Sequence, residues 1–220
     1  MKSVNAADIS PVLAGASWCL SAAGVVCAIV GLVASWAAAQ FSAGIVSGTG
    51  RFTLWEIVVE PKASLFGAVF SISDVTFGID DTLCGSAVKF EEVAEVCQTF
   101  DNMRICAVIA LIAAILALAG ASAVAGSVFC GLVGGTATRW SSAFAAAFSG
   151  VAWIAALVAV IEATTMPSTP EIKDVTNPGA GAICTGALIA LGFLAMALEA
   201  TCWCRSQAPK AREVGVTANV

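Results

Sequence analysis

Residues 103–134 read MRICAVIALIAAILALAGASAVAGSVFCGLVG, and the only charged side chain in this stretch is that of Arg104. A helix that crosses the roughly 30 Å hydrocarbon layer of a bilayer needs about 20 mostly apolar residues. The stretch is longer than that, and buried helices of soluble proteins rarely run this far without a charge. It therefore predicts a membrane-spanning helix.

Three further stretches meet the same length criterion, and no other part of the chain does. The predicted spans are 11–39, 103–134, 143–165 and 180–203, joined by an outer loop (40–102), an inner turn (135–142) and a second outer loop (166–179), with a tail at 204–220. Short connections favour antiparallel neighbouring helices. We expect one tetraspan domain over residues 1–220, an all-α membrane protein with a four-helix up-down bundle.

Composition supports this fold class and excludes others. Apolar residues make up 59% of the 220 residues and charged residues 11%, so a soluble globule and a disordered chain are both excluded. Ten Lys and Arg face fifteen Asp and Glu, which disfavours nucleic-acid binding. The chain has no histidine, and no pair of carboxylates lies within the predicted spans. We expect no enzymatic activity, no cofactor and no metal site.

Orientation follows from the Lys and Arg residues next to the helix ends. With both termini in the cytoplasm, the inner side carries Lys2, Arg139, Arg205, Lys210 and Arg212 on short segments. The first span has an alternative interpretation as a cleaved secretory signal, because Ala37-Ala38-Ala39 fits a small-residue cleavage site. Its apolar stretch is much longer than the usual 7–15 residues of a signal, which favours a retained helix.

Small residues recur in the first span at steps of three, four or seven. Such residues allow the close helix contacts that hold bundles together in lipid, either within one chain or between copies. They are Ser17, Ser21, Gly24, Ala28, Gly31 and Ser35.

Three ionisable residues lie in or next to the spans, and such residues are functional candidates by default. Arg104 and Glu162 are predicted near the outer boundary, where they could pair with each other. Glu199 is predicted near the inner boundary, with its carboxylate reaching the headgroups. We expect all three to be hydrated or paired residues of the membrane boundary.

The outer loop 40–102 carries nine acidic residues against three basic ones, a net charge of −6. Residues 52–59 and 64–77 are rich in Phe, Val, Ile and Thr with partial alternation, which is typical of strands. We expect a small antiparallel sheet above the membrane, followed by a short helix at 91–100. Trp55 either rests on the apolar helix ends with its N–H among the headgroups or fills the core of the loop.

Nine cysteines fall into two groups. Cys84 and Cys97 are the only pair in the outer loop, where the compartment is oxidising, and a disulfide between them would stabilise the loop by roughly 3 kcal/mol. Two thiolates without histidine fall short of a zinc site. Cys202 and Cys204 flank Trp203 at the inner end of the last span, so they are candidate palmitoylation sites, with idle thiols as the alternative.

Local residues resemble a known family. Phe52-Thr53-Leu54-Trp55 followed by an acid is similar to the core of the amastin signature, a family of trypanosomatid surface proteins within the claudin-like tetraspan superfamily. Cys97, Phe100 and Arg104 also resemble the passage into the second helix of that family. The chain departs from it at Arg51, where the signature usually begins with Cys, and Cys84 lies far beyond Trp55.

The resemblance implies a plasma-membrane protein with a role in host interaction or in membrane and lipid homeostasis. From the residues we expect a structural or interaction protein whose partners are membrane lipids and a protein or second copy that meets the first outer loop. A channel or transporter subunit is one alternative, since acidic rings can select cations. A claudin-like adhesion protein is the other.

Overall fold

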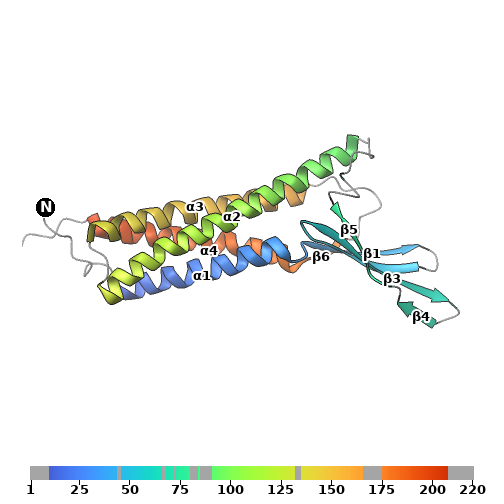
Figure 1. The fold of residues 1–220 in the computed structure, drawn as a ribbon, viewed down its shortest axis with the longest axis horizontal. Helices are drawn as coiled ribbons and strands as arrows, with labels where there is room; N and C mark the ends of the chain where they lie inside the picture. The colour runs from blue at the N-terminus through green and yellow to red at the C-terminus, as the bar shows by residue number, and fades with distance from the viewer. Residues whose placement is uncertain are drawn as a thin grey trace, which may run out of the picture.

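Four long helices dominate the structure. A computed structural model describes residues 10–43, 46–65, 68–71, 73–79, 84, 91–131, 135–165 and 175–207. Its helices are α1 (Pro11–Val33), α2 (Glu91–Cys130), α3 (Gly135–Thr165) and α4 (Ala180–Gln207). All four are long and apolar enough to cross a membrane, and Figure 1 shows them packed side by side with a sheet beyond one end. We call that end of the bundle the sheet end and the opposite one the far end.

Each helix packs against two others. α1 and α3 both contact α2 and α4. At the sheet end, the Gly181 N–H at the start of α4 donates to the Ser35 carbonyl just after α1, at 2.8 Å. Asn102, in the first third of α2, lies 3.5 Å from the Glu162 carboxylate near the end of α3. The start of α4 therefore lies beside the end of α1, and the first third of α2 lies beside the end of α3.

Small side chains fill the centre of the bundle, and large ones face outward. Apart from Leu188, the buried residues of the central cluster are all alanines: Ala28, Ala110, Ala113, Ala114, Ala152, Ala155 and Ala156. Ile112, Ile154 and Leu194 are each about half exposed. Burial of small residues under an apolar exterior is the pattern that lipid surroundings favour. In α1 it includes Ser17, Ser21, Gly24, Ala28 and Gly31, as predicted.

The sheet is antiparallel and contains six strands in the described residues. They are β1 (Ala37–Ala43), β2 (Val46–Phe52), β3 (Glu56–Leu65), β4 (Ala68–Ser71), β5 (Val75–Gly78) and β6 (Val175–Pro178). The order is β4-β3-β2-β1-β6, and β5 also pairs with β3. β6 comes from the second connection and pairs with β1, so both connections at the sheet end share one sheet (Figure 1).

The first span and the strands differ from the prediction. α1 ends at Val33 instead of residue 39, and Ala37–Ala43 forms β1. A short apolar run fits a strand as well as a helix, which is why 37–39 were assigned to the span. The predicted strand 52–59 is interrupted by a turn at 53–55, and 64–77 contains the end of β3 together with β4 and β5.

The remaining helix boundaries also moved. The predicted helix 91–100 and span 103–134 are one helix of 40 residues, about 60 Å long, whose first turns rise beyond α3 (Figure 1). Gly131, with a φ of 65°, takes the left-handed conformation that commonly follows the end of a helix. α3 begins at Gly135 and absorbs the predicted turn 135–142. α4 continues to Gln207, four residues beyond the predicted end.

Candidate functional site

A tight turn between β2 and β3 carries the residues that dock the sheet onto the bundle. The Thr53 Oγ1 accepts hydrogen bonds from the backbone N–H groups of Trp55 (3.1 Å) and Glu56 (2.9 Å). A threonine side chain that satisfies the backbone in this way stabilises a turn. Leu54 and Trp55 are therefore held at the tip of the β2–β3 hairpin, facing the helices.

Leu54 and Trp55 have different roles there. Leu54 is fully buried and packs in a cluster with Trp36, Met103 and Ala159. The Trp55 ring is 46% exposed, and its Nε1 donates to the Leu32 carbonyl in the last turn of α1, at 3.1 Å. The ring rests on the helix ends as one interpretation predicted, but its N–H bonds to a helix carbonyl where headgroups had been expected.

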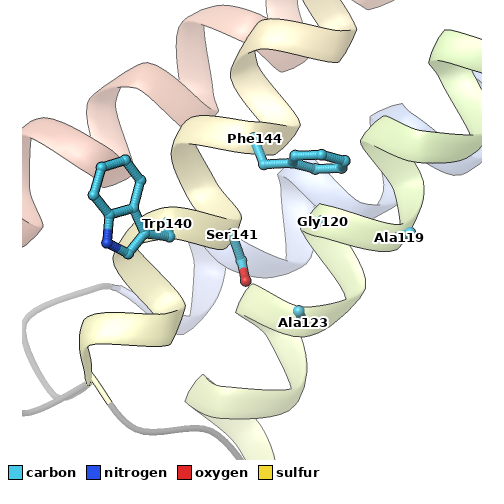
Figure 2. A pocket seen from close by; sticks show the side chains of 6 residues that line it. All are labelled: Ala119, Gly120, Ala123, Trp140, Ser141 and Phe144. Atoms are coloured by element: carbon cyan, nitrogen blue, oxygen red, sulfur yellow. The ribbon is translucent and has the colours of Figure 1, made fainter.

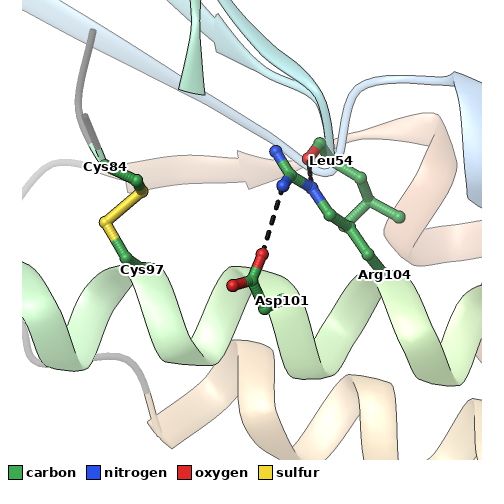
Figure 3. Close-up of a disulfide and its surroundings, with 5 residues drawn as sticks. All are labelled: Leu54, Cys84, Cys97, Asp101 and Arg104. Carbon is green, nitrogen blue, oxygen red and sulfur yellow. Dashed lines mark hydrogen bonds and ion pairs between the residues drawn. A yellow bond between two sulfur atoms is a disulfide. The ribbon is translucent and has the colours of Figure 1, made fainter. Parts of the chain in front are cut away.

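Arg104 connects α2 to the same turn. It is 8% exposed, and its Nε donates to the Leu54 carbonyl at 2.6 Å. Its Nη1 lies 3.2 Å from the Asp101 carboxylate one turn earlier (Figure 3). Its guanidinium carbon lies 5.0 Å from the centroid of the Trp55 ring. A partly desolvated cation over an aromatic face is stabilised by the ring quadrupole. Arg104 is thus a buried connector between helix and sheet.

The disulfide lies two helical turns from Arg104 along α2. Cys84 and Cys97 are bonded, with their Cα atoms 5.7 Å apart, which confirms the predicted pairing (Figure 3). Ile79, fully buried, accepts a hydrogen bond from the Cys84 N–H on its carbonyl and donates its own N–H to the Trp55 carbonyl. The end of β5, the hairpin tip and α2 are therefore linked within one region.

Trp36 was not singled out as a junction residue, although it joins both connections. Its backbone N–H donates to the Phe52 carbonyl at 2.7 Å, and its own carbonyl accepts from the Gly179 N–H at 2.8 Å. Its ring is buried and donates through Nε1 to the Gly31 carbonyl at 2.6 Å. The sequence signal was a tryptophan near the end of the first predicted span, 11–39.

The Glu199 carboxyl group is buried between helices and does not extend to the surface, which corrects the prediction that it reaches the headgroups. It is fully buried in α4, and both of its carboxylate oxygens contact serines of other helices. Ser17 of α1 donates to Oε1, and Ser142 of α3 lies 3.1 Å from Oε2. Helix packing covers the carboxylate with serines from two neighbours, which a single-helix view of the sequence cannot show. Glu162, by contrast, is half-buried and contacts Asn102.

The two candidate palmitoylation sites, Cys202 and Cys204, differ in exposure. Cys202 is fully buried and packs with Ala14 and Val124, so its sulfur is closed to acylation in this fold. Because it lies three residues after Glu199, Cys202 faces the bundle with that residue. Cys204 is exposed and remains a candidate.

A shallow groove of about 380 Å³ lies between α2 and α3 (Figure 2). Trp140 is 70% exposed beside it, and Ser141 is its only side chain with a hydroxyl. The helices come close here because Gly120 has no side chain: a Cβ would lie 3.0 Å from the Ala145 Cβ. The full lining is Ala119, Gly120, Ala123, Trp140, Ser141 and Phe144.

Within the part of the chain that the structure describes, no three His, Cys, Asp or Glu side chains form a group that could hold a metal ion. No known protein family matches the chain, and no curated protein is significantly similar to it.

Proposed function

We propose that the chain is a multi-pass plasma-membrane protein whose four helices form an up-down, claudin-like bundle with the sheet on the outer face. The contacts near the sheet end support alternating directions, because the start of α4 lies by the end of α1 and the first third of α2 lies by the end of α3. Arg139 and Arg205 lie toward the far end, which under the positive-inside rule favours a cytoplasmic far end and cytoplasmic termini.

The proposed role is structural or interactive, at the cell surface, as the amastin resemblance implies. One observation carries it: Leu54, Trp55, Arg104 and the Cys84–Cys97 disulfide fasten the sheet to the bundle. A fastened sheet presents a defined surface, and exposed apolar residues on a surface often mark interaction sites. Among the described side chains of β4 and β5, Val69, Val75 and Phe77 are exposed and apolar. The partner is a protein or a second copy, and lipids surround the helices.

Membrane orientation is tested by labelling intact cells with a membrane-impermeant maleimide. The Ser47→Cys variant places a thiol at an exposed position of β2, and we expect it to react before permeabilisation. The native Cys204, exposed near the far end, serves as the matched control and should react only after permeabilisation. Labelling in the reverse order would overturn the proposed orientation.

The interaction role is tested with a photoreactive amino acid in place of Phe77. Irradiation of intact cells should yield protein adducts at this position. The same substitution at Phe129, which is exposed near the far end of α2, should yield lipid adducts alone. Absence of any protein adduct at Phe77 would count against an interaction surface on the sheet, and selective ion flux through purified protein in liposomes would favour the channel alternative.

A further inference from the structure

The site that the proposed function leaves unexplained is the buried carboxyl group of Glu199. It lies in α4, is 0% exposed, and contacts serines of two other helices. Ser17 of α1 and Ser142 of α3 contact the carboxyl oxygens, and the adjacent buried cluster brings in Val124 of α2. The inference drawn here rests on these contacts and is independent of the role of the sheet.

No cation balances this carboxyl group among the described residues. The side chains that face it from α1 and α3 are serines, and the buried Cys202 is the titratable neighbour on its own helix. Arg139 and Arg205 are the basic residues nearest in sequence to Ser142 and Glu199, and neither forms an ion pair with Glu199. A buried carboxylate without a cation carries a desolvation cost of several kcal/mol, which binding a proton removes.

The hydrogen-bond geometry also accommodates a proton on the carboxyl group. The Ser142 Oγ lies 2.9 Å from the backbone carbonyl oxygen of Glu199 and 3.1 Å from its Oε2. A serine hydroxyl has one hydrogen, so it can donate fully to only one of these two acceptors. If Ser142 donates to the nearer carbonyl oxygen, the Oε2 contact is satisfied when Oε2 itself carries a hydrogen and donates it to the Ser142 Oγ.

We propose that Glu199 is a proton-binding site that closes the far end of the bundle. The proton stays on Oε2, and this O–H donates a hydrogen bond to the Ser142 Oγ. Ser142 in turn donates to the Glu199 carbonyl, and Ser17 donates to Oε1. Each polar group then has a partner, and α1, α3 and α4 are connected through one neutral carboxylic acid. Loss of the proton to solvent leaves an unbalanced charge among these helices and weakens their packing.

Infrared spectroscopy of the purified protein tests the protonation state directly. We expect a carbonyl stretch of a protonated carboxylic acid at neutral pH, absent from the Glu199→Gln variant and retained in the Glu162→Gln control. In the Ser17→Ala variant the band should move to higher frequency, because Oε1 loses its hydrogen-bond donor. This second variant keeps the test decisive if Glu199→Gln does not fold. A wild-type spectrum without this band would overturn the proposal.

The pH dependence of unfolding gives a second test. A group that holds a proton in the folded state and releases it on unfolding makes stability fall as pH rises above about 4.3, the ordinary pKa of glutamate. The folded-to-unfolded ratio should fall by up to about tenfold per pH unit over part of that range. Glu199→Gln, which keeps a donor and an acceptor, should remove this component. A ratio that responds to sodium at constant pH would instead indicate a cation site and overturn the proposal.

Discussion

The two ends of the helix bundle bury opposite charges in different ways. At the sheet end, the Arg104 guanidinium meets the Leu54 carbonyl, the Asp101 carboxylate and the Trp55 ring. At the far end, the Glu199 carboxyl group meets only hydroxyl groups among the described residues. At the sheet end, nearby acceptors and the aromatic ring stabilise the positive charge of Arg104. At the far end, hydroxyl groups alone do not balance a negative charge, which favours the protonated form of Glu199. The sheet end should therefore be stable over a wide pH range, whereas the far end should respond to pH.

The largest effect is expected where the sheet end is packed most tightly. Leu54→Ala removes a fully buried side chain from the cluster around Trp36, and such cavities cost about 2–5 kcal/mol of unfolding free energy. Unfolding in detergent micelles, followed by circular dichroism, measures this loss. Leu54→Met keeps most of the volume and should cost less than about 1.5 kcal/mol. Equal losses in the two variants would show that Leu54 does not act through packing.

Removal of the disulfide should cause the next largest loss of unfolding free energy, and the loss should arise at the sheet end. Cys97→Ser opens a ring of 14 residues, which corresponds to about 3 kcal/mol in the chain-entropy description. It also frees the Cys84 thiol for labelling, which mass spectrometry detects. The Cys204→Ser control removes an exposed free thiol and should leave stability unchanged. If Cys97→Ser is as stable as wild-type protein in which the disulfide is fully formed, the expectation is contradicted.

A smaller loss is expected at the far end. Ser142→Ala removes a buried hydroxyl that contacts the backbone carbonyl oxygen and the Oε2 of Glu199. A buried polar group left without a partner costs about 1–3 kcal/mol of unfolding free energy. The loss should shrink as pH rises, because the hydrogen bond that Oε2 donates to the Ser142 Oγ exists only while the carboxyl group holds its proton. Thr201→Ala, at an exposed position of α4 two residues after Glu199, should change stability by less than about 0.5 kcal/mol. A loss that does not vary with pH would separate Ser142 from the protonation of Glu199.

The smallest effect is expected on the open face of the sheet. Arg51 of β2 pairs with Glu60 of β3, and the Arg51 side chain is 55% exposed. Exposed ion pairs contribute about 0.2–1 kcal/mol and weaken with salt. Arg51→Ala should therefore lower stability by less than about 1 kcal/mol at low salt, with no difference at high salt. A loss that persists at high salt would point to packing by the arginine stem.

The features that could be predicted from the sequence are those that depend on local stretches of residues alone. Apolar stretches of sufficient length predicted the four helices, and small residues at close spacing predicted the buried face of α1. Cys84 and Cys97 could be paired because they are the only cysteines of the first outer loop. These inferences need no knowledge of which helices are neighbours.

Features that depend on neighbouring helices or strands were harder to predict. Ala37–Ala39 have no local signal that favours a strand, and they form β1 because β2 and β6 pair with them. Glu199 was assigned to the boundary from its distance to the predicted helix end. Its burial arises from Ser17 and Ser142, which come from α1 and α3. The docking role of Arg104 likewise depends on a turn 50 residues earlier in the chain.

Pairing between β1 and β6 has a mechanical consequence. The last turn of α1 and the first turn of α4 enter the same sheet within a few residues, through Ala37 and Pro178. A force applied by any molecule that grips the sheet therefore reaches both helices at once, and neither can slide along its axis without dragging the other. The two helices should move as one unit, with α2 tethered to the sheet through the Cys84–Cys97 disulfide and the hydrogen bond from Arg104 to the Leu54 carbonyl.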